Sequence, residues 1–271
     1  MLSVTALSIT INYIKGAVIM NIEKLKEYWT AEEEKAVMNG WDFSHIENRY
    51  SMDELPWDMT ELIYRYMKKT DRLLDIDTGG GEFLISLGHP PLLTSATEGW
   101  KPNVELCREK LGGLGIDFRE MTDYSAMPFN DGQFDIITDR HGSYDASEIF
   151  RVLKHGGVFI TQQVGDRNDR ELVELLLPDV QIQFAGNNLS TQSEIFRNAG
   201  FEIAEQNEVF RPIKFYDSGA LVWFARVIEW EFVSFSVEKC FDRLLDAERI
   251  IQENGSVDGS IHRFCFVAMK P

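Results

Sequence analysis

The sequence has few cysteines, and neither its cysteines nor its histidines are spaced as in a metal site. Cys107, Cys240 and Cys265 are far apart and form no C-x-x-C pair. An odd, scattered set argues against a disulfide framework and favours a reducing compartment, so we expect a cytoplasmic protein. The five histidines show no H-x-x-x-H spacing. We therefore predict no metal.

Basic residues are scarce relative to acidic ones. Lys and Arg number 27 against 44 Asp and Glu, which gives a formal net charge of −17. This balance disfavours a polyanionic partner, because phosphate backbones are bound by an excess of positive side chains. No run of Lys and Arg is interleaved with aromatic residues. We therefore expect a small-molecule partner and no nucleic acid.

Long hydrophobic runs are also absent, so we predict no association with a membrane. The first 19 residues are mildly apolar, but Lys15 interrupts them and no basic stretch precedes the apolar one. They match neither a signal peptide nor a membrane span. We interpret residues 1–20 as a dispensable extension, with a targeting role as the alternative.

Two regions follow this extension. Residues 21–70 show helical spacing on either side of an aromatic loop with Trp41, Phe43, Tyr50 and Trp57, and we interpret them as a helical cap. The loop is either a lid over a site or core packing. From Asp71, β-rich runs alternate with helices, the pattern of a mostly parallel α/β sheet. The runs lie at residues 72–77, 92–98, 116–121, 134–139, 157–164, 201–210 and 263–270.

A glycine-rich turn follows the first of these strands, in the sequence LLDIDTGGGEFL at residues 73–84. Ligands of open α/β sheets bind beyond the carboxyl ends of the strands, and glycines let the backbone approach a ligand closely. Glu98 ends the next strand about 20 residues later, where an acid can bind the hydroxyls of a ribose. Together these features predict a nucleoside ligand; a tight turn without a ligand is the alternative.

Two features distinguish the turn from a dinucleotide site. The pattern G-x-G-x-x-G fails, because its last position, counted from Gly79, is Leu84. Glu82 begins the following helix, where its charge would repel a pyrophosphate and suit a cation. S-adenosylmethionine has no phosphate and carries a sulfonium and an ammonium, so Asp75 and Asp77 are chemically suitable neighbours for it.

Across residues 71–270 the chain resembles the class I S-adenosylmethionine-dependent methyltransferases. The resemblance rests on the turn, on Glu98 with Trp100, on the Asp123 segment, and on MPFNDGQFDIITDRH (127–141) and EIFRVLKHGGVFI (148–160). It implies a Rossmann-like, doubly wound α/β fold with a mostly parallel seven-stranded sheet, and Asp123 as the residue that holds the adenine amino group. The expected cofactor-binding residues are Asp75, Asp77, Thr78, Gly79, Gly80, Gly81, Glu98, Gly99, Trp100, Asp123, Tyr124 and Asp139.

Asp77 departs from the family pattern D-x-G-x-G-x-G, which has glycine at this position. Aspartate is among the few other residues that tolerate a left-handed backbone, so we expect an adapted site. Two effects are open. The side chain could strain the turn and weaken cofactor binding, or its carboxylate could neutralise the ammonium of the ligand.

The residues that would handle a methyl acceptor are less clearly marked. Methyl transfer is an in-line displacement that chiefly requires positioning, so a catalytic residue need not stand out. His141, beyond the fourth strand, is a candidate base for a hydroxyl or thiol, and a structural histidine is the alternative. Residues 210–262 form a possible substrate-contacting insertion. Further pocket candidates are Arg140, Tyr144, Tyr216, Asp217, Trp223 and Trp230.

From these patterns we expect a methyltransferase domain at residues 71–271 that acts on a small molecule. DRHGSY at 139–144 stands where nucleobase and glutamine methyltransferases carry N/D-P-P-Y/F, so an RNA or protein methyltransferase is a weaker alternative. A nonenzymatic cofactor-binding or interaction protein is the other alternative, because fold does not dictate function.

Overall fold

The computed structural model describes residues 10–11, 20–37 and 42–271, so most of the predicted extension and Trp41 lie outside the described residues. The chain forms two compact units. The sheet unit comprises residues 54–168, 184–210 and 262–271. The helical unit comprises the described residues up to 53 together with residues 169–183 and 211–261. The domain boundaries expected at residues 20, 70 and 210–262 stay a prediction.

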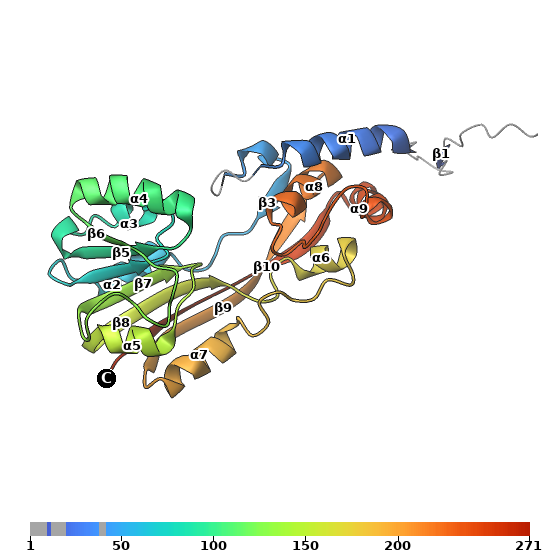
Figure 1. Ribbon diagram of the computed structural model, residues 1–271. Helices are drawn as coiled ribbons and strands as arrows, with labels where there is room; N and C mark the ends of the chain where they lie inside the picture. The colour runs from blue at the N-terminus through green and yellow to red at the C-terminus, as the bar shows by residue number, and fades with distance from the viewer. Residues whose placement is uncertain (1–9, 12–19, 38–41) are drawn as a thin grey trace, which may run out of the picture. The chain divides into compact units, whose positions relative to one another are not determined.

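Parallel strands form the centre of the sheet unit (Figure 1). β4 (Leu73–Ile76) pairs with β5 (Thr94–Glu98) on one side and with β7 (Phe134–Arg140) on the other. Further out, β6 (Asp117–Glu120) pairs with β5, and β8 (Leu153–Val164) pairs with β7, all in parallel. The chain leaves β4 toward one side and later returns to its other side, which makes the carboxyl end of β4 the switch point where ligands of such sheets bind.

Three more strands complete the sheet, in the order β3-β9-β10-β8-β7-β4-β5-β6. β10 (Val257–Met269) runs antiparallel to β8, and β9 (Glu202–Phe215) lies next to β10. β3 (Tyr50–Met52) pairs antiparallel with the end of β9. The mostly parallel α/β fold is confirmed, but the predicted count of seven strands is wrong by one. β3 was missed because three residues are too few to show an alternating pattern.

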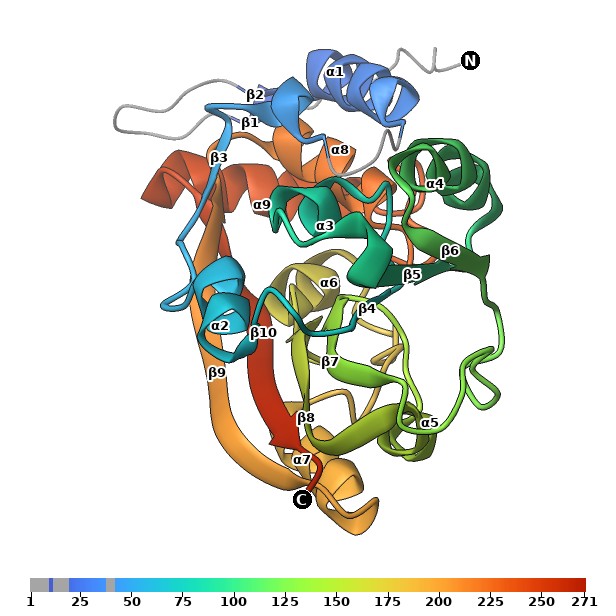
Figure 2. The ribbon, with the colours of Figure 1, turned by 90° about the vertical axis from the view of Figure 1, so that its left-hand side faces the viewer.

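Helices cover both faces of the central sheet. Neighbouring strand residues point to opposite faces, so Leu73, Ile136 and Ile160 belong to one buried cluster and Leu74, Ile137 and Phe159 to the other. α3 and α4 lie over the β4–β6 end of the sheet (Figure 2). The helices of this unit are α2 (Met59–Tyr66), α3 (Glu82–Ser86), α4 (Lys101–Leu114), α5 (Ala146–Val152) and α7 (Leu189–Asn198), and a short 3-10 turn, η2, spans Pro91–Leu93.

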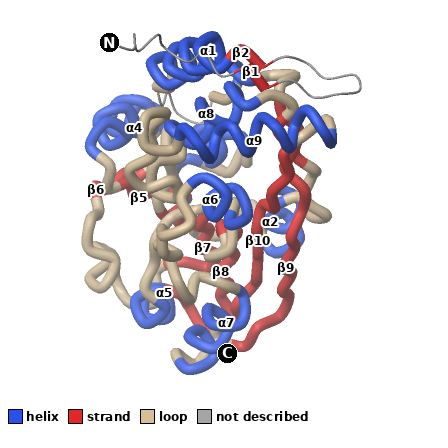
Figure 3. Tube along the Cα trace, turned by 90° about the vertical axis from the view of Figure 1, so that its right-hand side faces the viewer, coloured by secondary structure: helices blue, strands red, loops and turns tan. Residues whose placement is uncertain are grey.

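The helical unit is built mainly from helices (Figure 3). α8 (Ser218–Val227) packs against α1 (Ile22–Lys35) and α9 (Phe241–Asn254), and α9 also contacts α6 (Arg170–Leu176). No helix in the described part of the chain is both long and apolar enough to cross a membrane. The elements are α1 (Ile22–Lys35), α6 (Arg170–Leu176), α8 (Ser218–Val227), α9 (Phe241–Asn254), the 3-10 turn η1 (Ser44–Ile46), and a two-stranded antiparallel pair of β1 (Thr10–Ile11) and β2 (Met20–Asn21).

Candidate functional site

The glycine turn leaves the carboxyl end of β4 and bends directly into α3. Gly79 and Gly81 have φ angles of 64° and 78°, and Asp77 has a φ of 49°. All three lie in the left-handed region, which glycine adopts freely and aspartate tolerates. A Cβ on Gly81 would lie 2.8 Å from the Leu111 side chain of α4. This glycine is therefore required both by its backbone conformation and by the close packing of α4.

Glu98 holds the turn through its carboxylate. Oε2 accepts a hydrogen bond of 2.9 Å from the amide of Gly79, and Oε1 accepts bonds of 2.8 Å from the amides of Gly99 and Trp100. The side-chain amide of Asn103 donates to Oε2 at 3.3 Å. Glu98 is only 5% exposed. The acid is therefore a structural part of the turn, and a ribose would have to share its oxygens with these amides.

The acid at the start of α3 is paired with a base, which the sequence pattern did not indicate. Lys110 of α4 donates to the Glu82 carboxylate at 2.5 Å and to the carbonyl of Gly80 at 3.0 Å. This hydrogen bond lowers the pKa of Glu82 below its ordinary value. Lys110 therefore offsets part of the repulsion that Glu82 alone would exert on a phosphate.

The Asp77 side chain ties the turn to the loops that follow β6 and β7. Its Oδ2 accepts hydrogen bonds from the Tyr124 hydroxyl at 2.6 Å and from the Ser143 amide at 3.0 Å. Gly142 packs against Asp77 and Asp139, because a Cβ at Gly142 would lie 2.5 Å from Asp77 Cβ and 2.5 Å from Asp139 Oδ2. A larger residue at position 142 would force this loop off the two acids.

Three carboxyl groups, those of Asp75, Asp77 and Asp139, gather at the ends of β4 and β7. Thr138 donates to Asp75 at 2.6 Å, and Thr161 donates to Asp139 Oδ1 at 3.0 Å. Burial raises the pKa of all three groups, that of Asp75 to about 6, and repulsion from Asp77 raises the pKa of Asp139 further. Ionisation of these three carboxyl groups therefore costs more free energy than it would in water.

Several buried polar atoms at the turn accept or donate no hydrogen bond among the described residues. They include Oδ1 of Asp77, Oδ2 of Asp139, and the hydroxyls of Thr78 and Thr97. Buried acceptors without donors are costly, so such a group in a folded protein calls for a partner. A ligand with positive charge and N–H donors fits these oxygens.

Comparison with known proteins agrees with this geometry. Residues 74–161, which contain the turn and the strands around it, match the family model of a methyltransferase domain. The chain has the class I methyltransferase fold. No curated protein matches its sequence.

Solved structures show the same fold at low sequence identity. A candidate methyltransferase from Bacillus halodurans is similar over 79% of this chain and 99% of its own, with 19% identity and a TM-score of 0.54. The YcgJ protein from Bacillus subtilis is similar over 78% of this chain and 97% of its own, with 19% identity and a TM-score of 0.52. A protein of unknown function from Deinococcus radiodurans is similar over 92% of this chain and 98% of its own, with 14% identity and a TM-score of 0.51. These similarities concern the fold alone.

Two of the other predicted cofactor residues lie on exposed loops of the sheet unit. Asp123 follows β6, and its carboxylate accepts hydrogen bonds from the amide and the hydroxyl of Ser125, at 3.0 and 2.6 Å. Trp100 precedes α4 and is 63% exposed. The Asp123 carboxylate is thus bonded within its own loop, and the roles of Asp123 and Trp100 toward the cofactor stay predictions.

His141 begins the loop after β7 in the sheet unit, with a φ of 68°. The side-chain amide of Gln162 donates to its Nε2 at 3.2 Å, and Trp57 donates to the other end of that amide at 2.8 Å. Surrounding protein atoms and the charges of Arg263 and Arg140 lower the pKa of His141 to about 3, although the residue as a whole is exposed. Such a ring is a weak base, and its catalytic role stays a prediction.

Arg140 and Tyr144 point to different surroundings. The Arg140 guanidinium lies over the ring of Phe83, 4.2 Å from its centroid, and the residue is exposed. The Tyr144 ring packs edge-on against Phe159 and Phe196 in the core, with centroids 5.2 and 5.6 Å apart. The structure therefore accounts for Tyr144 as a core residue without any ligand.

Two predicted acceptor residues belong to the helical unit. Asp217 caps α8 by accepting from the Ala220 amide at 2.9 Å. Its two oxygens also bind the guanidinium of Arg49, at 2.8 and 2.9 Å. The Tyr216 hydroxyl lies 2.7 Å from the hydroxyl of Ser51. Asp217 thus has a structural role that explains its presence, and its part in acceptor binding stays a prediction.

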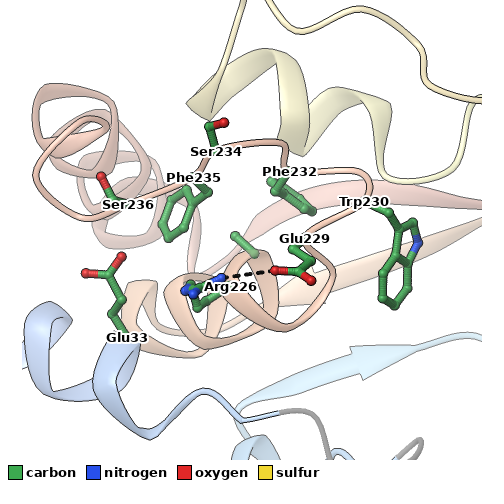
Figure 4. A pocket seen from close by; sticks show the side chains of 9 residues that line it. Glu33, Arg226, Glu229, Trp230, Phe232, Ser234, Phe235 and Ser236 are labelled. Carbon is green, nitrogen blue, oxygen red and sulfur yellow. Dashed lines mark hydrogen bonds and ion pairs between the residues drawn. The ribbon is translucent and has the colours of Figure 1, made fainter. Parts of the chain in front are cut away.

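A cavity of about 680 Å³ opens in the helical unit and is lined in part by Trp230 (Figure 4). Arg226 donates to Glu229 at 3.3 Å on its wall, and the Glu33 carboxylate accepts from the Val237 amide at 3.1 Å. Trp223, by contrast, is buried and stacks on the ring of His45. The other lining residues are Ala225, Phe232, Ser234, Phe235 and Ser236.

Sequence reasoning missed several residues that complete the acidic cluster. Gly142 and Ser143 contact Asp77, and Thr161 and Gln163 of β8 both donate to Asp139. A signal was present, since a glycine two residues after a strand end and polar side chains at the end of an apolar strand both indicate a site. Among the described residues, no group of His, Cys, Asp or Glu is arranged to hold a metal ion.

Proposed function

We propose that the protein binds S-adenosylmethionine at the glycine turn and transfers its methyl group to a small molecule. The observation that supports this best is the pair of buried oxygens, Oδ1 of Asp77 and Oδ2 of Asp139, that lack donors beside the turn. A cofactor with an ammonium and a sulfonium supplies the positive charge that these groups lack. The family match of residues 74–161 supports the same cofactor class.

Each part of the turn has a proposed role toward the cofactor. Glu98 would bind the ribose, Asp123 the adenine amino group, and the cluster of Asp75, Asp77 and Asp139 the charged end. When bound, the cofactor supplies an electrophilic methyl group. The protein then contributes position and charge, because an in-line displacement needs chiefly alignment of the reacting atoms.

The proposed acceptor is a small molecule, and the proposed location is the cytoplasm. The net charge of −17 supports the first part, since it opposes the approach of a polyanion. The sequence DRHGSY after β7 supports it too, because it lacks the prolines of the amide and nucleobase motif. An RNA or protein acceptor is the weaker candidate.

Calorimetry with S-adenosylmethionine, S-adenosylhomocysteine and NAD tests the cofactor class. We expect the two S-adenosyl ligands to bind and NAD to give no heat of binding. Mass analysis of the purified protein adds a check, because the measured mass identifies any ligand that co-purifies with the protein. Binding of NAD alone would overturn the proposal.

Methyl transfer is tested separately, with cofactor labelled in its methyl group. Label should move into the small-molecule fraction of a cell extract and stay out of its RNA and protein fractions. If the cofactor binds but no fraction gains label, the result would favour the alternative that the chain is a nonenzymatic cofactor-binding protein.

A further inference from the structure

Arg140, Gln162 and Arg263 lie close together at one edge of the sheet unit. Arg140 ends β7 and is the register partner of Gln162 in β8. On the other side of β8, Gln162 is paired with Cys265 of β10, and Arg263 lies two residues before Cys265. Register partners, and residues two apart in a strand, point to the same face of a sheet. The three side chains therefore share one face, at neighbouring positions.

Hydrogen bonds through Gln162 fix the protonation of His141, the residue that follows Arg140. The indole N–H of Trp57 can only donate, and it donates to Gln162 Oε1 at 2.8 Å. The amide nitrogen of Gln162 therefore faces Nε2 of His141, at 3.2 Å, and donates to it. A neutral imidazole that accepts at Nε2 carries its proton on Nδ1. His141 thus offers an N–H donor next to Arg140.

The Arg140 guanidinium is held in place without a carboxylate partner. It lies over the ring of Phe83, 4.2 Å from the centroid, and its side chain makes no hydrogen bond or ion pair with any residue that the structure describes. Its charge lowers the pKa of Asp75 against the larger effect of burial, but the Asp75 carboxylate accepts from Thr138 instead. The N–H groups of Arg140 are therefore available to an acceptor from outside the chain.

We propose that Arg140 and His141, together with the positive charge of Arg263, bind the carboxylate or phosphate group of a small molecule. The forked N–H groups of a guanidinium match the oxygens of either group. Repulsion from both arginines contributes to the low pKa of His141, so both positive charges act at the same place. The net charge of the chain is −17, so an anion depends on such a local cluster to bind at all.

This inference rests on the proposed function for the source of the anion. The group would belong either to the methyl acceptor, which would then be an anionic small molecule, or to the carboxylate of the cofactor. Both sources present the same chemistry to Arg140 and His141, and they differ in whether bound cofactor excludes a second anion.

Calorimetry with inorganic phosphate, on the full chain at low ionic strength, tests the anion site. We expect saturable binding to the parent and at least tenfold weaker binding to Arg140→Gln, because each hydrogen bond between charged groups contributes about a tenfold change in affinity or more. Arg140→Lys should lose less, since lysine keeps the charge but not the forked geometry. Arg140 is exposed, so these variants should fold as the parent does.

Arg197→Gln is the matched control. It removes the same charge from an exposed arginine of α7 that also forms no ion pair with a described residue, and it should keep the parent affinity. Absence of phosphate binding in the parent, or equal losses in Arg140→Gln and Arg197→Gln, would overturn the proposal.

A second phosphate titration, on the chain saturated with S-adenosylhomocysteine, identifies the source of the anion. Phosphate that still binds would assign the site to a ligand other than the cofactor, and exclusion of phosphate would assign it to the cofactor carboxylate. Failure of both S-adenosyl ligands to bind would refute the proposed function, whereas the titration of the free chain would still decide whether the anion site exists.

Discussion

The backbone amide of Gly79 donates a 2.9 Å hydrogen bond to the carboxylate of Glu98. The acid at the end of β5 therefore fixes the glycine turn at the end of β4, and under the proposed function the same side chain would also bind a ribose. Changes at position 98 should then affect both stability and ligand binding.

Glu98→Ala should weaken S-adenosylhomocysteine binding at least tenfold and lower the free energy of unfolding by about 2–3 kcal/mol. Hydrogen bonds to a charged group contribute about 1.5–3 kcal/mol each, and this substitution leaves three backbone amides without their acceptor. The loss should be smaller than the sum of the three, because water can hydrate the freed amides. Glu98→Gln should lose less of both. Calorimetry and urea unfolding measure the two effects. Binding as tight as that of the parent would show that the ribose assignment is wrong.

Asp77→Gly has two opposing effects, because it relieves backbone strain and removes the hydrogen bonds of the side chain. Glycine relieves a left-handed residue by about 1 kcal/mol, but it removes the acceptor for Tyr124 and Ser143, each bond being worth about 1.5 kcal/mol or more. We expect a net loss of about 1–3 kcal/mol in the free energy of unfolding and weaker binding of S-adenosylhomocysteine. Titration at low and high salt checks this, and tighter binding in the variant would mean that strain dominates.

Gly142→Ala should displace the loop from the acidic cluster. Its Cβ would lie 2.5 Å from Asp139 Oδ2 and from Asp77 Cβ, closer than such atoms approach in folded proteins. We expect destabilisation of about 1–3 kcal/mol, the usual cost of overpacking, and at least tenfold weaker cofactor binding. Gly112→Ala in α4 is the control, because nothing lies within 4 Å of its Cβ and alanine favours a helix. Parent-like affinity in Gly142→Ala would contradict the packing argument.

Asp75 should make stability depend on pH. Burial raises its pKa from 3.8 to about 6, so the folded chain keeps a proton that the unfolded chain releases between about pH 4 and 6. The contribution of this group to the free energy of unfolding therefore falls as the pH rises through that window, by about 3 kcal/mol in total. Asp75→Asn should flatten this part of the profile. Urea unfolding at pH 4.5, 5.5 and 7 measures it, and an unchanged slope would contradict the shift.

His141 should stay neutral throughout the physiological range. Its pKa is lowered from 6.5 to about 3, so its contribution to stability is present above about pH 6.5 and is lost as the pH falls from there toward 3. If His141 removes a proton from the acceptor, His141→Ala lowers turnover but keeps cofactor affinity. Turnover that is unchanged between pH 6 and 9, once an acceptor is known, would leave His141 with a structural role.

Local patterns were sufficient to predict most of the fold. The alternation that marks residues 134–139 and the glycine that follows residue 199 are short-range signals, and the structure places β7 at Phe134–Arg140 and ends α7 at Asn198. The strand expected at residues 157–164 begins earlier in the structure. β8 starts at Leu153, directly after α5 ends at Val152, and it runs through Gly156, whose φ is 76°.

The same distinction between local and long-range signals applies to the residues of the candidate site. By itself the sequence determined the glycine turn, the acids at positions 75, 77 and 98, and the class of fold, because each depends on residues close together in the chain. Only the tertiary structure decided that Asp77 meets Tyr124 and Ser143, that Lys110 pairs with Glu82, and that Tyr144 belongs to the core. Those outcomes depend on which loops the parallel strands bring to one edge of the sheet. Partners 28 to 66 residues apart leave no periodic trace in the sequence, since their meeting is set by strand order and helix packing.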